Sequence, residues 1–131
     1  MSKVTRINLK ESIKEDQRGW VINPLECAHI QNLTGNIHTA SITPSSMRGN
    51  HYHPNSTEWL FIFGGPALFC WRNLEDNIIH QEKIGEEEPT LFVVPPNIVH
   101  VIKNCAKKDI YIMAVTSSPH PDQVRMGEPL C

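Results

Sequence analysis

The stretch that decides the fold is Arg48-Gly49-Asn50-His51-Tyr52-His53, which is followed by Glu58. Side chains two residues apart on a β-strand point to the same face, so His51 and His53 are predicted to lie side by side, with Tyr52 facing away. Glu58 opens an otherwise apolar strand face, where an unpaired carboxylate would be costly to bury. Two imidazoles and a carboxylate that converge in this way indicate a bound metal ion.

His100 is the fourth predicted ligand. It follows the turn Pro95-Pro96-Asn97 and shares a strand face with Ile98 and Ile102. Imidazole and carboxylate ligands suit Zn, Fe, Mn, Ni or Cu, leave positions open for water or substrate, and do not single out one metal. The sequence therefore predicts one divalent metal ion bound by His51, His53, Glu58 and His100.

Short β-rich runs alternate with turn residues through the rest of the chain. The runs are Ile37–Thr43, Glu58–Phe63, Ala67–Arg72, Ile78–Ile84, Leu91–Val94, His100–Lys103 and Ile110–Thr116. Short strands at a spacing of roughly ten residues, with little helical periodicity, are typical of an all-β sandwich or barrel. The segment before residue 36 and the tail Ser117–Cys131 are expected to be irregular.

Length and composition narrow the class of protein. A chain of 131 residues, 40% hydrophobic and 20% charged, is the size of one folded domain. A net charge of −2 without a basic block argues against a nucleic-acid partner. No apolar segment approaches the roughly 18 residues of a membrane span, and the N-terminus lacks a signal-peptide pattern. We therefore expect a cytoplasmic protein without a membrane partner, whose cysteines are free thiols: Cys27, Cys70, Cys105 and Cys131.

These segments resemble the two sequence motifs of the cupin superfamily. The first motif is matched by His51, His53, Glu58 and Gly65, and the second by Pro95, His100 and Asn104. Three positions depart from the motifs. The opening glycine of the first motif lies six residues before its first histidine, whereas Gly49 lies only two residues before His51. In the second motif Pro89 replaces the opening glycine, and Asn97 replaces the glycine of the PxG turn, although asparagine also tolerates a left-handed backbone. The resemblance covers residues 36–116 and implies a single all-β cupin domain over residues 1–131, a jelly-roll barrel or double-stranded β-helix.

The stretch RGNHYH is similar to a signature of sugar-nucleotide-modifying cupins, which include the C-terminal domain of capsular-polysaccharide assembling proteins and nucleotide-sugar ketoisomerases. Asp16-Gln17-Arg18-Gly19-Trp20 is similar to the DxRGx segment of dTDP-4-keto-sugar epimerases. The resemblance implies a nucleotide-linked keto-sugar as substrate and metal-assisted proton transfer as reaction, of the epimerase or isomerase type. Arg18 and Arg48 are the candidates to bind its phosphates, because guanidinium binds phosphate oxygens bidentately; a surface ion pair is the alternative for Arg48.

The proton acceptor has to be another residue if all four ligands hold the metal. His38, on the strand before the HxH stretch, is one candidate, with a plain rim or core histidine as its alternative, and Tyr52 is the other if the strand twists. The ketoisomerases imply a different assignment, in which the two HxH histidines act as acid and base without metal, helped by a tyrosine on the preceding strand. Ile37–Thr43 contains no tyrosine, which counts against that assignment.

Two other functions stay open from the sequence: a non-catalytic, metal-dependent small-molecule binder or sensor, and an iron-dependent dioxygenase. A homodimer is also predicted. Trp59, Phe61 and Phe63 share the strand face away from the metal, and a barrel of this length has little chain to cover them. Exposed apolar patches of that kind usually mark interfaces.

Overall fold

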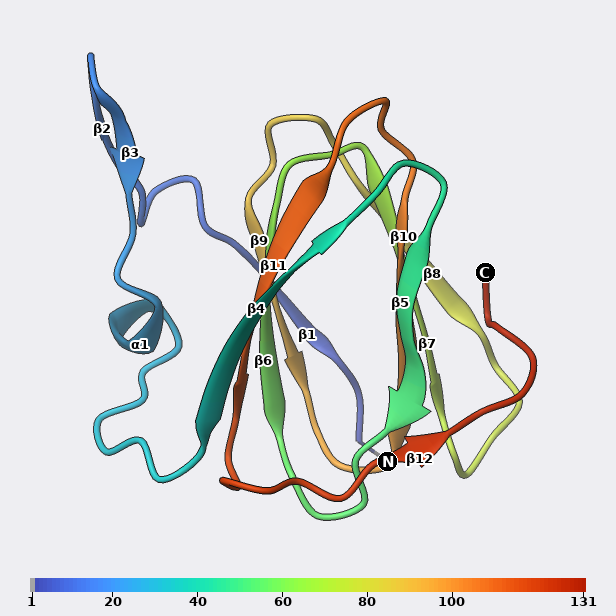
Figure 1. The fold of residues 1–131 in the computed structure, drawn as a ribbon. Helices are drawn as coiled ribbons and strands as arrows, with labels where there is room; N and C mark the ends of the chain where they lie inside the picture. The colour runs from blue at the N-terminus through green and yellow to red at the C-terminus, as the bar shows by residue number, and fades with distance from the viewer. Residues whose placement is uncertain (1) are drawn as a thin grey trace.

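Two antiparallel sheets face each other and form the body of the molecule in the computed structural model, which describes residues 2–131 (Figure 1). The first sheet has the order β1 (Thr5–Asn8), β9 (Thr90–Val94), β6 (Glu58–Phe63), β11 (Ile110–Thr116), β4 (Asn36–Ile42). The second has the order β12 (Val124–Arg125), β5 (Met47–Tyr52), β10 (Ile98–Asn104), β7 (Ala67–Asn73), β8 (His80–Ile84). The chain passes repeatedly from one sheet to the other, which confirms the predicted all-β cupin barrel.

Each predicted run contains a strand, with small differences at the ends. The run predicted from Ile78 begins as a strand only at His80, and the strand predicted from His100 already begins at Ile98. The segment expected to be irregular holds β1, the hairpin of β2 (Lys14–Asp16) and β3 (Gly19–Val21), and the one-turn helix α1 (Pro24–Cys27).

The core between the sheets consists of alternate residues of the facing strands. Leu60 and Ile62 of β6, Phe92 of β9, and Phe69 of β7 are almost fully buried. The rings of Phe69 and Phe92 stack across the two sheets with their centroids 4.0 Å apart. The strands on either side of the site are therefore held by close packing, the condition for a rigid site.

The outer face of β6 is covered by the N-terminal segment of the same chain. Phe61 is fully buried there in a second cluster that includes Leu9, and Trp20 stacks on Phe63 with ring centroids 5.0 Å apart. Figure 1 shows β2, β3 and α1 beside the first sheet, outside the two-sheet body. The expectation that a partner is needed to cover this face was wrong, because residues 7–33 supply the missing layer. The homodimer itself stays a prediction.

Replacing Leu9 with alanine should lower the free energy of unfolding by about 2–5 kcal/mol, because it opens a cavity over Phe61. Leu9 has no exposed surface, whereas Val21 in the same segment is 63% exposed. Chemical denaturation of Leu9→Ala and of Val21→Ala as the control measures the difference. Equal stabilities for the two variants would contradict the covering role of this segment.

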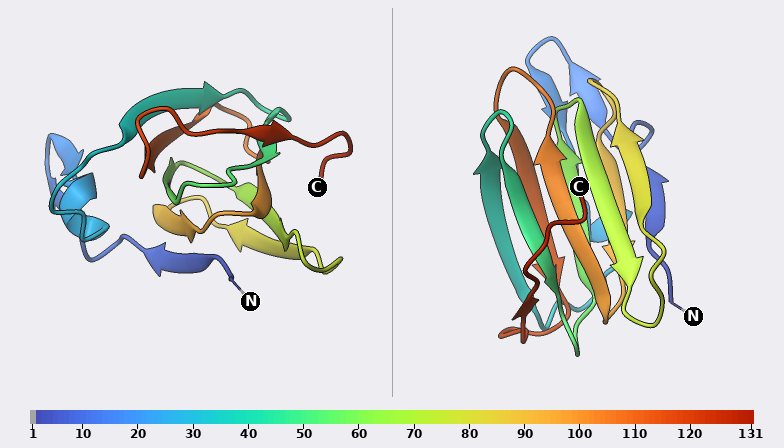
Figure 2. Two further views of the ribbon diagram at one scale, coloured as in Figure 1. Left: turned by 90° about the horizontal axis from the view of Figure 1, so that it is seen from below. Right: turned by 90° about the vertical axis from the view of Figure 1, so that its right-hand side faces the viewer.

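The prediction that all cysteines are free thiols was wrong for two of them. Cys70 and Cys131 form a disulfide, with Cα atoms 6.1 Å apart, while Cys27 and Cys105 are free. Cys70 lies on β7 between Phe69 and Trp71, which belong to the core between the sheets, so it faces outward. Figure 2 shows the tail returning along the second sheet to the C-terminus. No local pattern indicates a pairing between residues 61 positions apart. Among residues 2–131, none of the helices has the length and apolar character that crossing a membrane requires.

Candidate metal centre and cavity

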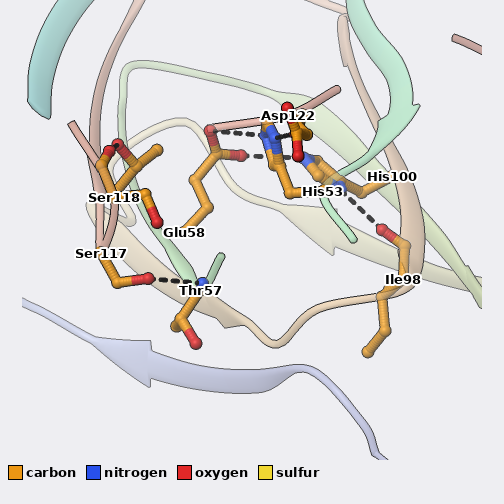
Figure 3. A network of polar contacts seen from close by, with 9 residues as sticks. His53, Thr57, Glu58, Ile98, His100, Ser117, Ser118 and Asp122 are labelled. Atoms are coloured by element: carbon orange, nitrogen blue, oxygen red, sulfur yellow. Dashed lines mark hydrogen bonds and ion pairs between the residues drawn. The ribbon is translucent and has the colours of Figure 1, made fainter. Parts of the chain in front are cut away.

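The structure brings the four predicted ligands together. His51 lies on β5, His53 directly after it, Glu58 at the start of β6 and His100 on β10. One potential ligand atom of each lies within 4.8 Å of the others. The Glu58 carboxylate is central: its Oε1 is 2.9 Å from Nε2 of His100 and its Oε2 is 3.4 Å from Nε2 of His53 (Figure 3). The ligands thus come from both sheets and close the space between them.

A β-bulge shapes the strand that carries the first histidine. Three consecutive residues of β10 pair with His51, Gly49 and Arg48, which leaves Asn50 as an extra residue. Gly49 and Asn50 have φ angles of 102° and 62°. A Cβ atom on Gly49 would lie 2.8 Å from the carbonyl oxygen of His100, so only glycine fits there. The bulge places Arg48 on the same face as His51, although an odd separation would put them on opposite faces of a regular strand.

Backbone carbonyls orient two of the imidazole rings. Nδ1 of His100 lies 3.0 Å from the carbonyl oxygen of Ile98, and Nδ1 of His53 lies 2.9 Å from that of Asp122 (Figure 3). A carbonyl oxygen only accepts, so Nδ1–H donates in both rings and Nε2 points toward Glu58. Histidines that bind metals are commonly oriented in this way.

The donor set fits a metal ion. With Nδ1 protonated, a neutral Nε2 presents a lone pair to the Glu58 carboxylate, and two acceptors repel each other unless a proton or a cation lies between them. Nε2 of His53 is buried and has no hydrogen-bond partner among the residues that the structure describes. A cation among His51, His53, Glu58 and His100 would satisfy this atom and the carboxylate together.

The pKa values of three of these groups are displaced. Burial, and next the neighbouring His100 ring, lower the pKa of His51 to about 4. Burial also acts to lower the pKa of His53, but the Glu58 carboxylate and the Asp122 carbonyl outweigh it and raise this pKa. Burial acts to raise the pKa of Glu58, yet the adjacent imidazoles of His100 and His53 hold it well below the usual range. At neutral pH Glu58 is therefore ionised and His51 neutral, whereas His53 retains a proton more readily than a free histidine.

The affinity for a divalent metal should fall as the pH drops below the pKa of His53. A metal at Nε2 has to displace the proton there. Because this pKa is raised above 6.5, the competition begins near neutral pH, whereas His51, with a pKa of about 4, does not compete there. One displaced proton corresponds to about a tenfold loss of affinity per pH unit. Zinc titrations between about pH 6 and 8 measure this slope, and a pH-independent affinity would contradict it.

A cavity of about 390 Å³ opens from the ligand cluster toward solvent. Its lining includes His38, Arg48, His51, Glu58, His100 and Arg125. Nε of Arg48 donates to the carbonyl oxygen of Ser41 at 2.7 Å, so the guanidinium is anchored by the backbone at the cavity wall. His38 lies on β4, exposed at the same opening.

Two predicted site residues do not reach this cavity within one chain. Tyr52 is not part of its lining, and its position on β5 next to His51 turns it to the opposite face. Arg18 sits in the β2–β3 hairpin, where its guanidinium forms an ion pair with Asp16 at 2.5 Å and its side chain is 86% exposed. The structure thus groups Arg48 and His38 with the ligand cluster, and places Arg18 and Tyr52 elsewhere.

Sequence reasoning missed the contribution of the tail. Gln123 and Arg125 line the cavity, and the Asp122 carbonyl holds His53. The tail was expected to be irregular, and β12 has only two residues, so no periodic pattern could have located it. The only sign of this contribution in the sequence was Arg125, an arginine in a polar segment.

Comparisons with known proteins agree with this architecture. The family model of the polysaccharide biosynthesis C-terminal domain matches residues 14–123. UDP-2-acetamido-2,6-beta-L-arabino-hexul-4-ose reductase from Pseudomonas aeruginosa is 26% identical over 98 residues, which are 75% of this chain and 25% of that protein. The chain therefore spans about a quarter of the length of this curated relative.

Solved structures share the fold. The dTDP sugar isomerase from Desulfovibrio desulfuricans G20 has a TM-score of 0.79 at 15% identity, with 95% of this chain and 83% of that chain covered. The sugar 3,4-ketoisomerase QdtA from Thermoanaerobacterium thermosaccharolyticum, solved in complex with TDP, has a TM-score of 0.68 at 13% identity, with 94% and 88% covered. Capsular polysaccharide assembling protein CapF from Staphylococcus aureus has a TM-score of 0.66 at 18% identity; 87% of this chain and only 33% of that chain are covered.

Proposed function

Because the chain belongs to the polysaccharide biosynthesis C-terminal domain family, we propose that it acts on a nucleotide-linked keto-sugar and moves a proton at a carbon next to the ketone. The observation that carries this proposal is the cavity itself. It combines a buried cluster of histidines and a carboxylate with an anchored arginine and an exposed histidine at its opening. In this proposal the sugar ring occupies the inner part of the cavity, and the phosphates remain near its opening.

The side chains have distinct proposed roles. Arg48 binds a phosphate oxygen, since its backbone contact at Ser41 holds the guanidinium in place. His38 accepts the proton next to the ketone, and its position at the opening lets it exchange that proton with solvent. A divalent metal held by His51, His53, Glu58 and His100 would supply a Lewis acid for the ketone oxygen.

The likenesses support the substrate class. The isomerase and the ketoisomerase named above are sugar-modifying proteins and each covers nearly all of this chain. The curated relative is a reductase whose name contains a UDP-linked 4-ulose. Since this chain matches only a quarter of it, proton transfer is assigned here to the cupin part alone.

Solvent deuterium exchange tests the proposal. Metal-loaded protein incubated in D₂O with a 4-keto UDP- or dTDP-sugar should place deuterium on the carbon next to the ketone, as followed by proton NMR. Removing the metal with a chelator should slow the exchange, and adding zinc back should restore it. Elemental analysis of the purified protein accompanies the assay. Absence of both binding and exchange would refute the proposal, and oxygen uptake by an iron-loaded sample would instead favour the dioxygenase.

A further inference from the structure

The C-terminal strap, defined here as residues 117–131, follows a path that touches the site and ends at the disulfide. It leaves β11 next to Thr57, whose backbone N–H donates to Oγ of Ser117 at 2.9 Å. It then crosses the end of the barrel beside His53 and pairs with β5 through β12. Figures 1 and 2 show it continuing along the second sheet to the C-terminus.

Arg125 is the charged side chain that the strap brings to the cavity. In the pairing of β12 with β5, Arg125 stands directly opposite His51, so both side chains project to the same face. Arg125 lines the cavity together with Arg48. Among residues 2–131, the arginines that form ion pairs with carboxylates are Arg6 and Arg18, and Arg125 forms none. Its charge also contributes to lowering the pKa of His51, consistent with their proximity.

The bulge residue Asn50 ties the strap to the strand that carries the ligands. The backbone N–H of Met126 donates to the carbonyl oxygen of Asn50 at 2.9 Å, and Nδ2 of Asn50 donates to the carbonyl oxygen of Met126 at 2.9 Å. Beyond Met126 the strap makes no further hydrogen bond within the described chain up to the Cys131 disulfide. The Cys70–Cys131 disulfide is therefore what fixes the C-terminal end of the strap to the second sheet.

We propose that the strap is a wall of the binding site, that Arg125 is its anion-binding side chain, and that the Cys70–Cys131 disulfide keeps this side chain in place. A diphosphate carries negative charge and several oxygen acceptors, which match the guanidinium groups of Arg48 and Arg125 that line the same cavity. The identity of the ligand as a nucleotide diphosphate rests on the proposed function. Binding of the diphosphate is consequently sensitive to reduction.

The redox step is an ordinary thiol–disulfide exchange. Cys70 is fully buried and Cys131 is partly exposed, so a dithiol reaches the sulfur of Cys131 first. The S–S bond breaks, both cysteines become thiols, and the dithiol is oxidised to its own disulfide. Opening this link frees the end of a strap whose own strand has only two residues. The fraction of molecules with Arg125 in place then falls, and the apparent affinity falls in proportion.

Calorimetric titration of the full chain with TDP, UDP and inorganic pyrophosphate tests the anion site. Arg125→Gln should weaken binding about 10- to 100-fold, the scale of a charge-assisted contact, and Arg125→Lys should recover part of the loss. Cys131→Ser, and the wild-type protein treated with dithiothreitol, should both bind about three- to tenfold more weakly. Cys105→Ser, which removes an exposed free thiol, is the matched control and should bind normally.

The pattern across variants separates the possible outcomes. Dithiothreitol should not weaken binding by Cys131→Ser any further, because this variant already lacks the disulfide. It should have little effect on Arg125→Gln, because this variant already lacks the anion-binding side chain. Hydrogen exchange should show faster exchange of the Met126 amide after reduction. Unchanged binding by Arg125→Gln, or an unchanged exchange rate at Met126, would overturn the proposal. The wild type could bind pyrophosphate, with a loss in Arg125→Gln, and yet bind neither TDP nor UDP. That result would support the anion site and contradict the proposed action on a nucleotide-linked keto-sugar.

Discussion

Replacing His100 with alanine is expected to abolish metal binding and to destabilise the metal-free protein. The change removes one of four ligands and leaves the buried Glu58 carboxylate without its partner at 2.9 Å. A buried carboxylate that loses its partner is an uncompensated buried charge, which costs about 3–5 kcal/mol in the free energy of unfolding. Elemental analysis should give background metal for His100→Ala and about one ion per chain for the wild type, and denaturant unfolding gives the stability.

His120→Ala is the matched control, because His120 is exposed and lies outside the cluster. It should keep the metal and the stability of the wild type. Glu58→Gln serves as a second variant if His100→Ala does not fold, since it preserves the size of the side chain and removes the charge at the centre of the cluster. Retention of one ion per chain by a folded His100→Ala or Glu58→Gln protein would contradict the predicted centre.

Replacing His38 with asparagine is expected to slow solvent deuterium exchange into a 4-keto sugar nucleotide by about 10²- to 10⁴-fold, the usual contribution of a general base. Metal content should not change, because His38 is not one of the four clustered ligands. Proton NMR in D₂O gives the rate, and elemental analysis of the same sample gives the metal. A loss of rate with full metal loading would separate proton transfer from metal binding.

Tyr52→Phe provides the comparison for this experiment. Tyr52 neighbours His51 in sequence but does not line the cavity, so its loss should leave the exchange rate within about a factor of two. The opposite pattern, with a normal rate for His38→Asn and a large loss for Tyr52→Phe, would assign the base to Tyr52. A normal exchange rate for both variants would indicate that the histidines of the cluster transfer the proton.

Local sequence by itself determined the strands and the spacing of the ligands. His51 and His53 approach each other, with ring centroids 5.0 Å apart, because strand parity is a property of the backbone within a few residues. Asn97 has a φ of 64°, as its place in the second motif required. Turn residues and alternating apolar residues act over equally short distances, so the short strands and the all-β class could be predicted, whereas the jelly-roll barrel followed from the resemblance to the cupin motifs.

Only the tertiary structure decided what surrounds the ligands. Arg48 reaches the cavity because Asn50 is an extra residue in the pairing with β10, a feature of register that no single strand contains. Arg125 reaches it because the strap pairs with β5, and Cys131 meets Cys70 across 61 residues of chain. These placements depend on which distant segments pair. That choice is made by the packing of the whole barrel, whereas strand parity is fixed by the backbone of each segment alone.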